Sequence, residues 1–289
     1  MKSHLYKTAA GRQRLDQWYE RFLAKIETPV ETRTVPTRFG ENQVLVTGPA
    51  DAPPLVVLHA MRTGAAFLLS ELGPLLTKYR VYAPELPGQS VRGLDVRLPL
   101  QDESAAFWLA DVMDGLSLES ANLLGVSWGG FIARLTASHM PHSVPRLALL
   151  VPAGIANGSH LTGLMKMAWP MIRYQVRPSE ANLQKLLLPL LSTWDDDWGG
   201  FIACTIRDLK MDPRIPPVAT DEQLKQLTMP VLAIVGEEDI SFPGHLVEQR
   251  LRSQVPTAEV EVVPGMKHCP PTTPEFRTWL AQRLTAFFG

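Results

Sequence analysis

The sequence predicts an α/β protein in which a mostly parallel central sheet is flanked by helices. Two observations carry this prediction. Short apolar runs rich in Val and Leu alternate with longer amphipathic runs, and the short runs are continuous, as in strands that are buried on both faces. The chain of 289 residues is 45% apolar and 20% charged, the composition of a globular protein with a sizeable core.

Each element follows from its own pattern. The first 26 residues mix charges with apolar positions and predict an amphipathic helix. Strands are then expected at 54–60, 79–86, 121–127 and 146–153, with helices at 67–79, 104–116 and 128–140. The last part of the chain predicts a strand at 229–239, a helix at 245–255, a strand at 258–266 and a C-terminal helix at 274–288.

The alternation breaks between residues 154 and 228, where the chain is mostly helical and contains no strand-like run. We therefore expect three parts: residues 1–153 with the N-terminal helix and the first part of the core, 154–228 as a helical lid, and 229–289 as the second part of the core. Ligands bind at the carboxyl edge of open α/β sheets. The inserted segment is expected to cover that edge.

A Gly-x-Ser-x-Gly motif spans Gly125, Ser127 and Gly129, between a predicted strand and a predicted helix. This is the arrangement of a nucleophile elbow, in which a strained turn exposes the serine hydroxyl. The two glycines are expected because a Cβ atom at either position would meet the crowded backbone. Ser127 is the predicted nucleophile.

A serine hydroxyl needs a histidine to take its proton and a carboxylate to orient that histidine. In the chain order Ser, acid, His, both His245 and His268 follow the elbow, and His268 lies in the loop after the last predicted strand. The acid is expected in the Glu-Glu-Asp run that ends at Asp239, with Glu238 as the next choice. Residues 153–155, after the strand that precedes the lid, contain no acid.

The oxyanion formed on attack needs two backbone N–H donors. One is expected from Trp128, directly after the nucleophile, and the other from Met61, in the loop after the 54–60 strand. His59 is expected to order this loop. Arg62 is expected to face either solvent or the mouth of the pocket, and the sequence leaves this choice open.

Composition excludes several classes of partner. The 28 Lys and Arg residues against 29 Asp and Glu give no basic excess for nucleic acid. Only Cys204 and Cys269 occur, which predicts neither a disulfide framework nor a zinc site, and no phosphate-binding Gly loop appears. No cofactor or metal is therefore expected. The apolar run at 147–156 is too short to span a membrane, so a soluble cytoplasmic protein is expected, of open oligomeric state.

Together the elbow, the Glu-Glu-Asp segment and the final histidine resemble an α/β-hydrolase with a lid. The N-terminal helix and residues 35–60 are similar to the bacterial carboxylesterase NP (naproxen esterase) group, which hydrolyses esters of arylpropionic acids. The sequence departs from that group at Ala60 and at 84–90. The resemblance implies the triad Ser127, Asp239 and His268, and a carboxylic ester as substrate.

These features predict a serine esterase that works through an acyl-enzyme intermediate. A serine in place of an aspartate disfavours dehalogenase and epoxide hydrolase chemistry. The lid contributes Met and Trp side chains that suit an apolar or aromatic ester, or that simply pack the lid on the sheet: Met165, Met167, Trp169, Met171, Trp194 and Trp198. Two alternatives stay open: a small-molecule receptor with slow turnover, and a C–C bond hydrolase.

Overall fold

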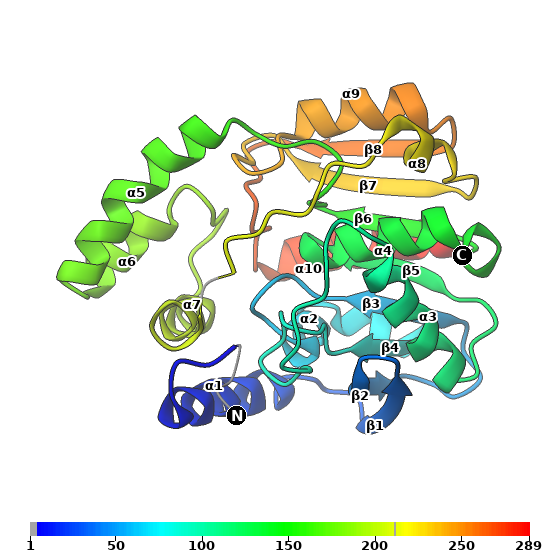
Figure 1. Cartoon of the computed structure of the whole chain (residues 1–289), viewed down its shortest axis with the longest axis horizontal. Helices are drawn as coiled ribbons and strands as arrows, with labels where there is room; N and C mark the ends of the chain where they lie inside the picture. Colours follow the sequence, from blue (N-terminus) through cyan, green and yellow to red (C-terminus); the bar gives the residue numbers. More distant parts are fainter. Residues whose placement is uncertain (1–4, 211) are drawn as a thin grey trace.

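The computed structural model describes residues 5–210 and 212–289, and it is built on an eight-stranded sheet in the order β1-β2-β4-β3-β5-β6-β7-β8 (Figure 1). Residues 1–4, part of the predicted N-terminal helix, and residue 211, part of the predicted lid, lie outside the described residues. All pairs from β4 onward in this order are parallel, whereas β1–β2 and β2–β4 are antiparallel. The strands are β1 (Val30–Thr37), β2 (Gly40–Thr47), β3 (Pro54–Leu58), β4 (Arg80–Pro84), β5 (Asn122–Val126), β6 (Leu147–Leu150), β7 (Val231–Gly236) and β8 (Ala258–Val263).

The hairpin of β1 and β2 is the part of the sheet that the sequence did not predict. Nearly every residue of β1 is exposed or half-buried, because β1 is the edge strand. It therefore lacks the continuous apolar run by which the buried parallel strands were found.

Helices cover both faces of the sheet, as predicted. Alternate side chains of β3 enter two separate apolar clusters: Val56 and Leu58 join one, and Leu55 and Val57 join the other. The first cluster contains residues of α3 (Ser104–Gly115), α4 (Trp128–His139), α8 (Asp221–Lys225) and α9 (Gly244–Gln254). The second contains residues of α1 (Ala9–Leu23), α2 (Ala65–Glu71), a 3₁₀ helix (Gly73–Thr77) and α10 (Pro274–Phe288). The helix expected at 67–79 is thus two elements, divided at Gly73 and Pro74.

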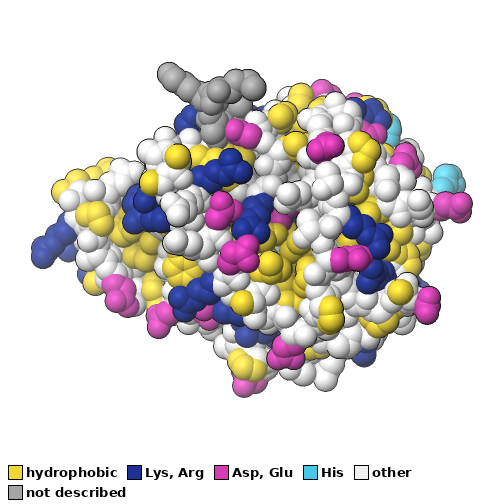
Figure 2. Space-filling view, turned by 90° about the horizontal axis from the view of Figure 1, so that it is seen from below, with side chains coloured by type: hydrophobic (Ala, Val, Ile, Leu, Met, Phe, Trp, Pro, Cys, Tyr) yellow, Lys and Arg dark blue, Asp and Glu magenta, His cyan; other side chains and the backbone are white. Residues whose placement is uncertain are grey.

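The inserted segment forms α5 (His160–Val176), α6 (Glu180–Leu187) and α7 (Asp196–Asp208), which we call the cap helices. Figure 1 shows them to one side of the sheet, beyond the strand ends, and Figure 2 shows hydrophobic side chains on the surface of the lobe that α5 and α6 form at the left. The short helix α8 lies within the range predicted as lid, but it packs against α4 and α9 and buries Leu224 in their cluster. The cap helices therefore end before α8.

The N-terminal helix α1 packs against both α2 and the cap helix α7. Arg14 forms an ion pair with Asp208, and Lys25 forms one with Asp197. Because α1 contacts both parts, it ties the cap to the body of the protein. Within residues 5–210 and 212–289, no helix is long and apolar enough to cross a membrane.

Candidate active site

Ser127 lies in a sharp turn between β5 and α4, where the sequence predicts the elbow. Its φ of 50° and ψ of −109° are a strained combination for a residue with a side chain. A Cβ atom on Gly125 would lie 2.5 Å from the carbonyl oxygen of Gly129, and one on Gly129 would lie 2.2 Å from that of Leu58. Only glycine fits at these two positions, because both contacts are with backbone atoms.

His268 connects Ser127 to a carboxylate. The Oγ of Ser127 lies 3.0 Å from Nε2 of His268, and Nδ1 of His268 lies 2.8 Å from Oδ2 of Asp239. The three residues follow β5, β7 and β8, so the carboxyl edge of the sheet brings them together although 141 positions separate Ser127 from His268. The structure thus forms the hydrogen-bonded chain that a serine nucleophile requires.

The carboxylate of Asp239 is buried and held by its own loop. Its Oδ1 accepts hydrogen bonds from the backbone N–H groups of Ser241, at 2.7 Å, and Phe242, at 3.0 Å, which leaves Oδ2 for His268. The neighbouring Glu237 and Glu238 are exposed. Asp239 is therefore the member of the acidic run that faces the site, and its orientation is fixed before any ligand binds.

Four other histidines lie away from this triad. His139, His142 and His245 are exposed, whereas His59 is buried beneath the loop that contains Met61. Nδ1 of His59 lies 2.7 Å from the carbonyl oxygen of Ala60, and Nε2 accepts the backbone N–H of Leu86 at 3.0 Å. Burial lowers the pKa of His59 to about 4, so the ring is neutral at neutral pH, and it orders the loop as expected.

The loop 60–64 crosses above the end of β3, and Met61 lines the same cavity as Ser127. Trp128 is the first residue of α4, so its amide directly follows Ser127. Thr63 Oγ1 donates to the carbonyl of Ala60, and the backbone N–H of Val91 donates to the carbonyl of Thr63. The loop is therefore held at both ends, which suits a fixed amide donor at Met61.

A buried carboxylate that sequence reasoning missed supports this loop from below. Glu85 is fully buried and accepts hydrogen bonds from the hydroxyl groups of Tyr19 and Ser90, and from the backbone N–H of Ala65 at 3.2 Å. Burial raises the pKa of Glu85, while these donors oppose the rise. In the sequence, Glu85 had no distinguishing pattern, because its partners come from three separate segments.

A cavity of about 470 Å³ lies over Ser127 and His268, within the range of small-molecule sites. Its wall is mostly apolar and comes from the strand-end loops on one side and the cap helices on the other. Of the six lid residues singled out above, Met167, Met171 and Trp198 line the cavity. Met165, Trp169 and Trp194 are instead exposed, at 66%, 67% and 38%.

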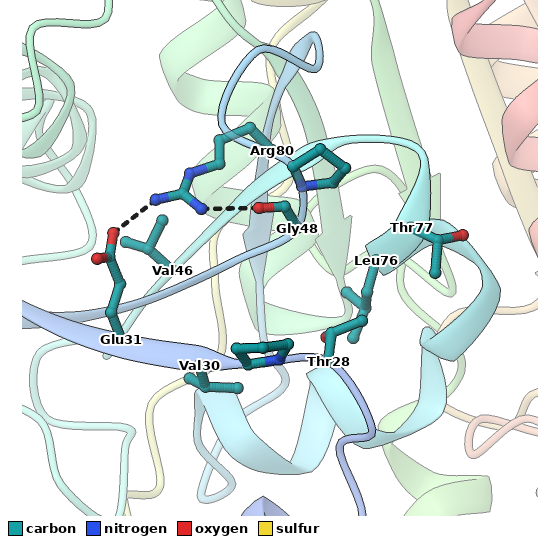
Figure 3. Close-up of a pocket in the computed structure, with 10 residues that line it drawn as sticks. Thr28, Val30, Glu31, Val46, Gly48, Leu76, Thr77 and Arg80 are labelled. Carbon is teal, nitrogen blue, oxygen red and sulfur yellow. Dashed lines mark hydrogen bonds and ion pairs between the residues drawn. The ribbon is translucent and has the colours of Figure 1, made fainter.

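A second hollow of about 490 Å³ lies beside the β1–β2 hairpin (Figure 3). Arg80 crosses it, donating to the carbonyl of Gly48 at 2.7 Å and to Glu31 at 2.6 Å. Arg80 begins β4, and Ser127 follows the parallel strand β5, so the two hollows lie toward opposite ends of the strands. The residues that line this hollow include no His, Ser or Cys. It is therefore not the candidate active site, although its volume is similar.

Fold and site together define a class. A family model described as alpha/beta hydrolase fold matches residues 53–186. The crystal structure of naproxen esterase (carboxylesterase NP) from Bacillus subtilis superimposes with a TM-score of 0.84 at 25% identity, covering 98% of this chain and 100% of that one. The chain is therefore a protein of the α/β-hydrolase fold, as the sequence predicted.

Curated relatives are similar over most of the chain. An uncharacterized carboxylesterase, nap, of Bacillus subtilis (strain 168) is 28% identical over 274 residues, which are 88% of this chain and 85% of that protein. The carboxylesterase YbfK of the same organism is 27% identical over 268 residues, with 88% and 87% covered. The predicted resemblance to bacterial carboxylesterases is thereby confirmed.

Proposed function

We propose that this protein is a serine carboxylesterase that cleaves a small ester through an acyl-enzyme intermediate. The observation that carries the proposal is the hydrogen-bonded chain from Ser127 through His268 to Asp239, which ends in an apolar cavity. The similarity to two carboxylesterases and to the naproxen esterase structure supports the same activity.

In the first step, Ser127 Oγ attacks the ester carbonyl while Nε2 of His268 takes its proton. Asp239 holds the other side of the ring, and it stabilises the imidazolium that forms. The developing oxyanion accepts hydrogen bonds from the amides of Met61 and Trp128. His268 then returns the proton to the departing alcohol, and an acyl group stays on Ser127.

In the second step, water enters from the cavity, and His268 acts again as the base. Attack on the acyl-enzyme releases the carboxylic acid and restores Ser127. The cap helices act as a lid in this scheme, because Met167 and Met171 face the nucleophile across the cavity.

The apolar wall favours an ester with an apolar or aromatic group. Phe67, Phe201 and Trp198 line the same wall, and the rings of Phe67 and Phe201 are stacked with 4.0 Å between their centroids.

The two cysteines form no disulfide with each other, which supports a reducing compartment. We infer that the protein is located in the cytoplasm.

The test is release of p-nitrophenol from acetate, butyrate and octanoate esters by the parent and by Ser127→Ala. Sustained turnover in the parent and its loss in a folded Ser127→Ala protein are expected. A burst of one equivalent of p-nitrophenol with no further release would instead indicate the receptor with slow turnover. Cleavage of a vinylogous diketone without ester turnover would indicate the C–C bond hydrolase. Parent-level turnover by Ser127→Ala would contradict the assignment of the nucleophile.

A further inference from the structure

The active-site cavity contains an arginine, Arg62, that has neither a role in the proposed mechanism nor, in the described part of the chain, a hydrogen-bond partner for its guanidinium group. Arg62 follows Met61 directly and lines the cavity together with Ser127. The sequence left open whether it faces solvent or the pocket, and the structure answers this, because Arg62 is only partly exposed and contributes to the cavity wall.

Three Lys or Arg side chains of the described residues line this cavity, and two of them have hydrogen-bond partners. Arg277 donates to both carboxylate oxygens of Glu71, and Lys7 donates to the carbonyl of Ile206. Within residues 5–210 and 212–289, Arg62 makes no hydrogen bond or ion pair through its guanidinium group. A guanidinium group withdrawn from water without an anion is unfavourable, and burial lowers the pKa of Arg62 without neutralising it.

The acidic group whose charge acts on Arg62 is Asp212, and it is already occupied. The negative charge of Asp212 acts on Arg62 without a hydrogen bond between the two residues. The Asp212 carboxylate instead accepts hydrogen bonds from Arg214 at 2.8 and 2.9 Å and from Gln89 at 3.1 Å. Arg97 is a second cationic group beside Asp212, with its Nε 3.8 Å from Oδ2. Asp212 therefore does not supply the missing partner of Arg62.

The backbone of Arg62 gives a second, independent observation. Its φ of 57° lies in the left-handed region, where glycine would be unstrained. In the described part of the chain, four non-glycine residues have such a φ, and three of them, Arg62, Ser127 and Val151, line the cavity. A side chain retained at a position that favours glycine indicates that the side chain itself is used.

We propose that Arg62 binds a carboxylate on the substrate, so that the preferred ester carries a second, ionised acid group. The planar guanidinium group pairs with a carboxylate through two parallel hydrogen bonds. One such group balances one negative charge. The other two basic groups of the wall, Arg277 and Lys7, are already engaged by their hydrogen-bond partners, so a single carboxylate fits Arg62 better than the two charges of a phosphate monoester. Because Arg62 adjoins the oxyanion donor Met61, the acid group and the ester belong to one small molecule.

This inference rests on the proposed esterase activity. It is tested by comparing, within each protein variant, the kcat/KM for an anionic ester with that for a matched neutral ester. Each pair of esters differs by one charge: mono-4-nitrophenyl glutarate against its methyl ester, and 3-carboxy-4-nitrophenyl butyrate against 4-nitrophenyl butyrate. The first pair places the acid on the acyl side and the second on the alcohol side. The ratio of kcat/KM, anionic over neutral, cancels any general loss of activity.

In the parent we expect a ratio above about 10 in one of the two pairs, and Arg62→Gln is expected to lower it about 10- to 100-fold. Arg62→Lys keeps the positive charge but cannot form the two parallel hydrogen bonds of a guanidinium group, so it is expected to give an intermediate ratio. Arg252→Gln, which removes a charge from a surface ion pair with Glu248, is the matched control and leaves the ratio unchanged. A ratio near 1 in both pairs, or one that Arg62→Gln does not lower, overturns the inference. Absence of turnover with all four esters would instead contradict the esterase itself.

Discussion

The hydroxyl of Tyr19 on α1 donates a hydrogen bond to the buried carboxylate of Glu85, directly below the loop that carries Met61. Glu85 also accepts from the amide of Ala65, at the far end of that loop. Because α1 contacts the cap helix α7 as well, one helix links the cap to the proposed oxyanion donor. The N-terminal helix is therefore part of the support of the site.

Tyr19→Phe tests this support. The change leaves Glu85 with one donor fewer in a buried position, so we expect a loss of about 1–3 kcal/mol in the free energy of unfolding. In the proposed mechanism the amide of Met61 acts in the transition state, so kcat is expected to fall about 10-fold while KM changes little.

The matched control is Tyr79→Phe. Tyr79 is equally buried in the same apolar cluster, but its hydroxyl donates to the carbonyl of Gly289, away from the cavity. Stability should fall by about 1 kcal/mol and kcat should stay at the parent value. Equal effects of the two changes on kcat would show that Tyr19 acts on stability alone.

The crowded backbone at the elbow predicts that alanine substitution destabilises the protein far more at Gly129 than at Gly73. In Gly129→Ala the new Cβ atom would lie 2.2 Å from the carbonyl oxygen of Leu58, so the turn must open and folding should be lost or weakened by more than about 3 kcal/mol. In Gly73→Ala no heavy atom lies within 4 Å of the new Cβ, so stability should change by less than about 1 kcal/mol. Thermal unfolding of both variants measures this, and comparable melting temperatures would refute the crowding at the elbow.

His59 predicts a pH dependence of stability. Its pKa is about 4 in the folded protein against about 6.5 in the unfolded chain, so the unfolded chain binds a proton first as the pH falls. The stability that the neutral ring contributes is complete above pH 6.5 and is lost as the pH falls toward 4. Between pH 7.5 and 5.0 this loss amounts to about 2 kcal/mol.

Urea unfolding at these two pH values measures the effect in the parent and in His59→Gln. The variant should lose about 2 kcal/mol less than the parent, because glutamine does not titrate. The raised pKa of Glu85 acts with the opposite sign. Because Oε2 of Glu85 lies 3.6 Å from Nε2 of His59, the difference between the two proteins measures His59 together with its effect on Glu85. His245→Gln, at an exposed position on α9, should follow the parent. Identical pH slopes in the parent and His59→Gln would contradict a buried, neutral His59.

Local patterns account for what the sequence predicted well. The elbow at Gly125, Ser127 and Gly129 is a contiguous motif that can be recognised in the sequence. Buried parallel strands such as β7 can be recognised as continuous apolar runs, because both of their faces are buried. The edge strand β1 was missed because an exposed strand has no such run, and β2 was missed because its apolar run, residues 44–46, is only three residues long. The pair of Tyr19 and Glu85 was also missed, because 66 positions separate two residues that only the tertiary fold brings together.

The most direct test of the account is covalent labelling of the nucleophile with diethyl p-nitrophenyl phosphate. We expect one equivalent of p-nitrophenol, one diethylphosphoryl group on the peptide that contains Ser127, and loss of ester hydrolysis in proportion to labelling. The reason is that His268, 3.0 Å from Ser127 Oγ, is proposed to activate that hydroxyl. Ser127→Ala should take up no label. Ester hydrolysis that persists at full labelling of Ser127, or a label found on another residue as activity disappears, would contradict the central claim.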